Sequence, residues 1–182
     1  MNARQVLEYT KKMTLLYVED DVSLRLSTQK LFENFFESVK VACDGEEGLY
    51  LYLEAVRKKQ PYSLIISDIA MPNLDGIAMC EAIMNNNPAQ PFIFVTAYNE
   101  TNHLMRAVEM GASGFLTKPI QYDHLIRTLS RVGQAYSYHH FFEEKYASVS
   151  ALYLEVETQR IELEAKNKKL EAALLLLSPE NN

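Results

Sequence analysis

Five polar side chains stand directly after short apolar runs of the sequence. Glu19 and Asp20 follow the first run, Asp68 follows the third, and Thr96 and Lys118 follow the fourth and fifth. Carboxylate oxygens are ligands that Mg²⁺ prefers, and an ammonium group and a hydroxyl can both bind phosphoryl oxygens. A carboxylate can also act as a nucleophile and take a phosphoryl group as an aspartyl phosphate. If the five side chains converge, they predict a magnesium-dependent phosphoryl acceptor with Asp68 as the nucleophile. Asp68 alone would have an ordinary explanation as a turn residue.

The segments around these residues alternate between short apolar runs, typical of buried strands, and longer stretches with helical spacing. The expected strands cover residues 14–18, 39–42, 62–67, 92–95 and 114–117. The expected helices begin near Val22, Glu46, Asp75, Asn99 and Gln121. Five such alternations predict an α/β domain, a doubly wound parallel sheet covered on both faces. In these sheets ligands bind beyond the carboxyl ends of the strands, where the five polar side chains stand.

Composition narrows the class of protein. The chain has 182 residues, is 48% hydrophobic and 23% charged, and carries a net charge of −6. These values are typical of a soluble globular protein, and the acidic balance argues against nucleic acid as a direct partner. Cys43 and Cys80 are expected to be packing residues, and zinc is disfavoured because no His or Cys lies near the acids. No apolar run is long enough to span a membrane, and no signal peptide is visible, so we expect a cytoplasmic protein.

Residues 134–178 contain neither Gly nor Pro, which predicts one long helix. An apolar residue recurs at every heptad a position from Phe142 onward: Phe142, Val149, Val156, Leu163, Leu170 and Leu177. The corresponding d positions are mixed: Lys145, Leu152, Gln159, Lys166 and Ala173. We expect a parallel dimeric coiled coil, the alternative being a helix that folds back onto the first domain. The predicted organisation is a short N-terminal helix (1–12), a main domain (13–133), the long helix (134–178) and a tail (179–182).

The first roughly 130 residues resemble the receiver domain of two-component response regulators. The resemblance rests on four motifs in the family's order and spacing, LYVEDD at 16–21, SDIAMPNLDG at 67–76, VTA at 95–97 and GASGFLTKP at 111–119. It implies a flavodoxin-like fold with strand order 2-1-3-4-5. It also implies that Asp68 accepts phosphate from a histidine kinase.

The resemblance assigns roles to the residues around Asp68. Glu19, Asp20, Asp68 and the backbone carbonyl of Ala70 would bind Mg²⁺. Thr96 and Lys118 would bind the phosphoryl group, and the Lys118-Pro119 peptide bond would be cis.

Two further implications concern switching and the lifetime of the phosphoryl group. Thr96 and Phe115 would form a conformational switch, the alternative for Phe115 being a static core aromatic. Ala70 and Tyr98 occupy positions that vary in the family and would modulate the phosphoryl lifetime, Tyr98 by shielding the group from water.

The expected function is therefore that of a phosphorylation-controlled receiver, which assists its own phosphorylation and dephosphorylation but is otherwise not an enzyme. The expected partners are a histidine kinase and a second copy bound through residues 134–178, with neither nucleic acid nor membrane contacted directly. An alternative is that these residues form the N-terminal regulatory part of a larger signalling enzyme, such as a cyclic-dinucleotide synthase, a phosphodiesterase or a kinase. A third option is a dimer that scaffolds a partner.

Overall fold

The computed structural model describes residues 3–97 and 101–177, with side chains from 6 to 97 and from 105 to 175. The chain divides into two compact units, Met1–Ser137 and Tyr138–Asn182. We describe each unit separately.

The first unit contains one five-stranded parallel sheet with the order β2-β1-β3-β4-β5. Its strands are β1 (Thr14–Val18), β2 (Ser38–Ala42), β3 (Leu64–Asp68), β4 (Phe92–Thr96) and β5 (Gly114–Thr117). The helices are α1 (Ala3–Thr10), α2 (Val22–Phe32), α3 (Gly45–Arg57), α4 (Gly76–Met84), α5 (Thr101–Glu109) and α6 (Tyr122–Leu177). This confirms the predicted doubly wound parallel sheet and the strand order that the resemblance implies.

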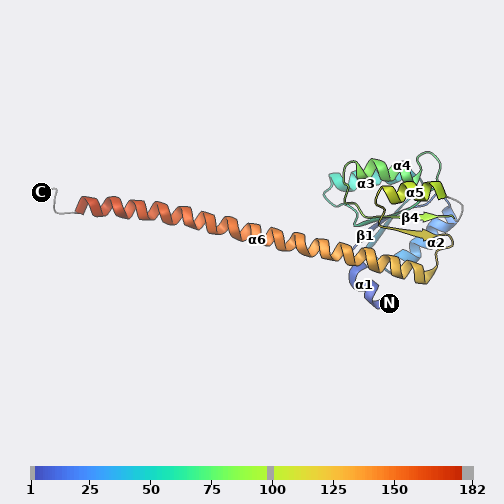
Figure 1. The fold of residues 1–182 in the computed structure, drawn as a ribbon, viewed down its shortest axis with the longest axis horizontal. Helices are drawn as coiled ribbons and strands as arrows, with labels where there is room; N and C mark the ends of the chain where they lie inside the picture. Colours follow the sequence, from blue (N-terminus) through green and yellow to red (C-terminus); the bar gives the residue numbers. More distant parts are fainter. Residues whose placement is uncertain (1–2, 98–100, 178–182) are drawn as a thin grey trace. The chain divides into compact units, whose positions relative to one another are not determined.

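Helices cover both faces of the sheet. Figure 1 shows α3, α4 and α5 on one side, with α1, α2 and the first turns of α6 on the other. Strand side chains alternate between the two faces of the sheet. On β1, Leu15 and Tyr17 belong to the core beneath α1, α2 and α6, whereas Leu16 and Val18 belong to the core beneath α3, α4 and α5. All residues of β3 and β4 are buried, as expected for central strands of a two-sided sheet.

Three aspartates begin the helices that follow the first three strands. The side chains of Asp21, Asp44 and Asp75 each accept a hydrogen bond from the backbone N–H three residues later, at distances of 2.7 to 2.9 Å. Such N-caps satisfy N–H groups that the first helical turn leaves without partners. They also set where each loop ends, and so fix the loops at the carboxyl edge of the sheet.

The last helix continues through the point where the sequence changes character. We expected a receiver helix from about Gln121 and a long helix from residue 134, but α6 is one helix of 56 residues with Gly133 inside it. A Cβ atom at Gly133 would lie 2.8 Å from the Cβ of Tyr9. The absence of a side chain therefore lets α1 pack closely against α6, with Val6 buried in the same core as Val132.

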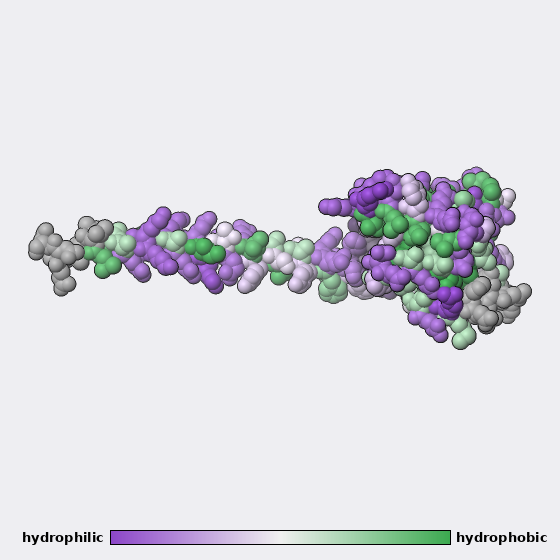
Figure 2. Space-filling model, turned by 90° about the horizontal axis from the view of Figure 1, so that it is seen from above, coloured by the Kyte–Doolittle hydropathy of each residue, from purple (hydrophilic) through white to green (hydrophobic). Residues whose placement is uncertain are grey.

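The second unit consists of the remainder of α6. From Tyr138 to Leu175 every side chain is exposed except that of Glu157, which is partly exposed. Figure 2 shows hydrophobic and hydrophilic surface interspersed along this helix. None of the helices in the described part of the chain combines the length and the apolar character needed to cross a membrane.

Candidate functional site

Three carboxylates meet at the carboxyl edge of the sheet. Glu19 and Asp20 follow β1, and Asp68 is the last residue of β3, the strand beside β1. Each offers an oxygen within 4.8 Å of the oxygens from the other two. Glu19 is fully buried and Asp68 nearly so, whereas Asp20 is exposed. The cluster is therefore buried at Glu19 and Asp68 and open to solvent at Asp20.

Lys118 joins the cluster from the loop after β5. Its Nζ lies 2.5 Å from Oδ2 of Asp68 and 3.0 Å from a carboxylate oxygen of Glu19. The other Asp68 oxygen, Oδ1, accepts a hydrogen bond of 2.7 Å from the Ile69 N–H. One ammonium and three carboxylates leave two negative charges, which one Mg²⁺ ion would balance. The hard oxygen donors fit Mg²⁺ as well.

Burial and charge shift the ionisation of this cluster. Burial raises the pKa of the Glu19 carboxyl, and the neighbouring Asp68 charge adds to the rise, while the hydrogen bond from Lys118 opposes it. Burial would lower the pKa of Lys118, but its hydrogen bonds to Asp68 and Glu19 outweigh burial and raise it. Lys118 is thus held as a cation, and it offsets part of the electrostatic cost of burying Glu19.

The loop after β3 is closely packed beneath Asp68. A Cβ at Gly76 would lie 2.1 Å from the Asp68 carbonyl oxygen, and the Gly76 N–H donates a 2.9 Å hydrogen bond to the Ile69 carbonyl. Asn73 adopts a positive φ of 63°, and its amide donates to Asp44 at 2.8 Å. Ala70 lies in this loop, exposed, two residues after Asp68. Because a Cβ at position 76 would collide with the Asp68 backbone, only glycine there lets the start of α4 approach the end of β3 so closely.

Thr96 and Phe115 lie on the two strands beyond β3. Thr96 ends β4, is buried, and its hydroxyl donates a 2.9 Å hydrogen bond to the Ala97 carbonyl. The partly buried Phe115 ring on β5 stacks against Phe94 at a centroid distance of 6.3 Å. The Lys118-Pro119 bond is cis, as the resemblance implies. Tyr98, predicted to modulate the phosphoryl lifetime, lies outside the described residues.

Sequence reasoning missed two residues that support the acidic cluster. The Arg25 guanidinium on α2 donates hydrogen bonds to the backbone carbonyls of Glu19, at 2.5 Å, and Asp20, at 3.1 Å. The Tyr17 hydroxyl donates to the Glu19 carboxylate at 3.2 Å, and burial followed by the Glu19 charge raises its pKa. The role of Arg25 could have been predicted from the sequence, because Arg25 stands four residues after the Asp21 N-cap and therefore one helical turn from the acidic loop.

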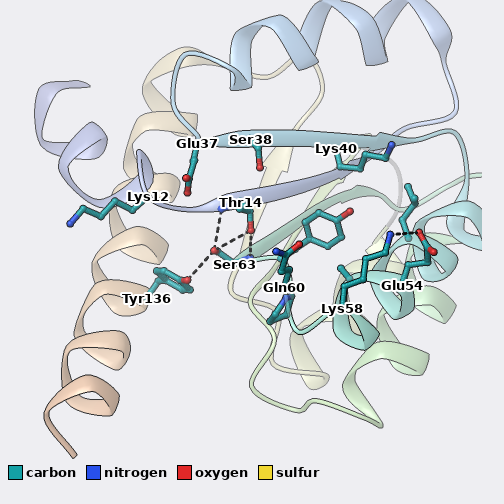
Figure 3. Close-up of a pocket in the computed structure, with 14 residues that line it drawn as sticks. Lys12, Thr14, Glu37, Ser38, Lys40, Glu54, Lys58, Gln60, Ser63 and Tyr136 are labelled. Atoms are coloured by element: carbon teal, nitrogen blue, oxygen red, sulfur yellow. Dashed lines mark hydrogen bonds and ion pairs between the residues drawn. The ribbon is translucent and has the colours of Figure 1, made fainter. Parts of the chain in front are cut away.

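A concavity lies at the opposite, amino edge of the sheet. It is a groove of about 640 Å³ that contains none of the predicted site residues. Figure 3 shows Ser63 at its wall, where the hydroxyl contacts the Tyr136 hydroxyl at 2.9 Å and the Thr14 backbone N–H at 3.1 Å. In the same view the Lys12 and Lys40 side chains point toward opposite ends of the groove. Glu54 and Lys58 in this groove neutralise each other in an ion pair at 3.2 Å, so the acidic cluster remains the candidate site.

The fold and the site together define a flavodoxin-like α/β domain with an acidic cluster and a lysine at the carboxyl edge of its sheet. Residues 15–130 match the response regulator receiver domain family, and the chain belongs to that family.

Similar proteins include a probable chemotaxis protein CheY from Rhizobium etli, 31% identical over 69% of this chain and 96% of the relative. Transcriptional regulatory protein ZraR from Escherichia coli K12 is 34% identical over 64% of this chain. That alignment covers only 25% of ZraR, so this chain matches about a quarter of such regulators. A solved N-terminal domain of an uncharacterized protein from Wolinella succinogenes is 30% identical, with a TM-score of 0.61, over 72% of this chain and 98% of that domain.

Proposed function

We propose that this chain is a phosphorylation-controlled receiver in two-component signal transduction, with Asp68 as the acceptor of a phosphoryl group from a histidine kinase. The observation that carries the proposal is the convergence of Glu19, Asp20, Asp68 and Lys118 at one edge of the sheet. Membership of the receiver family supports it.

The proposed chemistry is one phosphoryl transfer. An oxygen of Asp68 attacks the phosphorus of a phosphohistidine, so that the new P–O bond forms as the P–N bond breaks and the imidazole leaves with the electron pair and takes a proton. Lys118, already 2.5 Å from Asp68, neutralises a phosphoryl oxygen, and the Thr96 hydroxyl turns from Ala97 to donate to another. Hydrolysis of the acyl phosphate by water returns Asp68 to its carboxylate.

Mg²⁺ completes the site in this proposal. Glu19, Asp20, Asp68 and the Ala70 carbonyl would hold the ion, which would offset the negative charge that develops on the phosphoryl oxygens. The two negative charges that remain beside Lys118 support this choice of ion. Arg25 holds the backbone carbonyls of Glu19 and Asp20 through hydrogen bonds, and so would act on the shape of the ion site without contacting the ion.

Phosphorylation would be read out through Thr96 and Phe115. Movement of Thr96 toward the phosphoryl group vacates space that the half-buried Phe115 ring, now stacked on Phe94, would fill.

Ala70 offers no polar side chain to the site, so Tyr98 would set the lifetime of the phosphoryl group. A Tyr98→Ala variant should lose phosphate faster than wild type, as measured by intact mass at timed intervals. An unchanged rate would remove Tyr98 from the proposal.

The signal would leave through the long helix in a homodimer paired by residues 134–178. The exposed apolar side chains of that segment support the dimer. A cytoplasmic location belongs to the same proposal. The domain division 1–12, 13–133, 134–178 and 179–182 belongs to the same proposal, with Tyr122–Ser137 as the part of α6 inside the first compact unit.

Regulation of a catalytic output domain remains the alternative function, and in it Asp68 keeps the same role.

The test is phosphorylation by acetyl phosphate followed by intact mass spectrometry. The wild-type chain should gain one phosphoryl group with Mg²⁺ present and none with EDTA. Asp68→Asn should gain none, whereas Asp123→Asn, an exposed carboxylate in the first turn of α6, should behave as wild type. Phosphate incorporation by Asp68→Asn would show that another residue is the acceptor.

A further inference from the structure

The second unit is a helix whose regular apolar row is exposed to solvent. The row repeats every seven residues, and its members are between 53% and 66% exposed: Phe142, Val149, Val156, Leu163 and Leu170. A row with this spacing stays on one side of a helix over its whole length only when two helices wind around each other. The row is therefore the part of this helix best suited to contact another helix.

Two further rows flank the central row, and a two-stranded seam uses only one of them. The row three residues later contains Lys145, Leu152, Gln159, Lys166 and Ala173. The row four residues later contains Tyr146, Tyr153, Arg160, Asn167 and Leu174. The second of these rows offers three large apolar side chains, which are between 62% and 77% exposed, and the first offers Leu152 and a small alanine. Burial of apolar area therefore favours the row with the tyrosines.

We propose that two copies pair in parallel with the central row at heptad d and the tyrosine row at heptad a. This rests on the proposed homodimer and replaces the heptad assignment that the sequence alone suggested, in which Phe142 stands at a. Asn167 then faces its counterpart at an a position. A single Asn in that position fixes two strands, parallel orientation and one register, because the amide pair is satisfied only in that arrangement.

Arg160 is the one charged residue that this seam contains between Phe142 and Leu174, and the structure shows how its charge is met. Its guanidinium lies 3.4 Å from a carboxylate oxygen of Glu157 and 3.5 Å from one of Glu164. In the proposed register both glutamates stand at e, beside the seam. The aliphatic part of Arg160 can therefore cover the neighbouring layers while its charged end stays paired at the edge.

The flanking charges select parallel over antiparallel pairing. The e positions are Glu143, Ser150, Glu157, Glu164 and Glu171. Antiparallel helices bring e positions against e positions, which would align these acids with one another. Parallel helices bring g against the following e, which places Lys166 opposite Glu171 of the second copy and Gln159 opposite its Glu164. Only the parallel pair avoids the repulsion.

Cysteine cross-linking of the full chain tests the register. In a Cys43→Ser background, which keeps only the buried Cys80, we compare Asn167→Cys with its neighbour Lys166→Cys under mild oxidation. At heptad a, the two thiols introduced by Asn167→Cys come within disulfide reach, so that variant should cross-link about tenfold faster than the g-position variant. Faster cross-linking of Lys166→Cys would restore the other heptad assignment and overturn the proposal.

Sedimentation equilibrium of the Cys43→Ser chain separates failure of the register from failure of the dimer. A mass of two chains together with fast cross-linking of Asn167→Cys supports the proposal. A mass of two chains with no cross-linking of either variant indicates antiparallel pairing and overturns it. A mass of one chain refutes the homodimer itself while leaving phosphorylation of Asp68 intact, and a mass of three or four chains refutes a two-stranded seam.

Discussion

Replacement of Lys118 by Met should destabilise the first unit by leaving two buried carboxylates without their cation. The ammonium lies 2.5 Å from Asp68 and 3.0 Å from Glu19, and its side chain is 25% exposed. Removing one partner of a buried ion pair typically costs about 3–5 kcal/mol. Because Lys118 keeps some contact with solvent, we expect the lower end, about 3 kcal/mol, at neutral pH in EDTA.

The pH dependence gives this prediction its specific signature. In the wild-type protein the pKa of Glu19 is raised above its unfolded value of 4.5, so the folded state binds more protons above that pH and stability falls as pH rises through the folded pKa. The pKa of Lys118 is also raised, so its contribution to folding stability is complete below pH 10.5 and is lost only above that pH. Met at this position removes a hydrogen bond that lowers the Glu19 pKa. The fall in stability between pH 5 and pH 7.5 should therefore be steeper in the variant.

Urea unfolding followed by circular dichroism at pH 5 and pH 7.5 provides the assay. Lys30→Met, an exposed lysine on α2, is the matched control and should change stability little at either pH. Addition of Mg²⁺ should restore part of the lost stability, since a cation that binds only the folded state stabilises it. A loss of the same size at both pH values would mean that the cost is one of packing, and a loss no larger than that of Lys30→Met would refute the electrostatic account.

Three other substitutions test the packing that surrounds the site. Gly76→Ala places a Cβ 2.1 Å from the Asp68 carbonyl oxygen and should lower the free energy of unfolding in urea by about 3 kcal/mol. The same substitution should slow phosphorylation by acetyl phosphate. Wild-type values for both measurements would contradict the close approach. Gly133→Val should cost about 2 kcal/mol despite the better helix propensity, because its Cβ meets the Tyr9 Cβ at 2.8 Å, and an unchanged urea midpoint would show that α1 is not packed there. Tyr136→Phe should cost about 1 kcal/mol by removing the hydroxyl that contacts Ser63, whereas Tyr138→Phe, which is 60% exposed, should cost nothing measurable; equal effects would refute the contact.

The sequence was sufficient for features that depend on local pattern. Apolar runs bounded by acids or glycine mark strands, and in a parallel sheet the carboxyl ends necessarily share an edge, which places Glu19, Asp68 and Lys118 at that edge. Their convergence depends also on the strand order, which the resemblance to receiver domains implied. Features that depend on packing between distant segments were not visible. The contact of Tyr9 with Gly133 joins residues that lie far apart in the sequence, and the hydrogen bond of Tyr17 to Glu19 depends on which face each side chain takes.

The long helix shows a different limit of sequence reasoning. An apolar residue every seven positions predicts a coiled-coil seam but leaves open which neighbouring row completes it, since the same residue can stand at a or at d. The sequence-based assignment with Phe142 at a placed two lysines in the seam. The ion pairs of Arg160 with Glu157 and Glu164 show how a charge in the tyrosine row is met, and it is this contact between side chains that makes that row acceptable.

The backbone around Lys118 gives the proposed switch a physical route. The Lys118 N–H donates a 3.0 Å hydrogen bond to the Thr96 carbonyl, so the two residues that would bind the phosphoryl group are joined through their main chains. Thr96 pairs with Thr117, and Phe115 stands two residues earlier on the same strand, in register with Phe94. A shift of Thr96 and Lys118 toward Asp68 would therefore pull the end of β5 with it. Phe115 would respond because its partly buried ring stacks on Phe94, and the space that Thr96 vacates would let the ring turn inward.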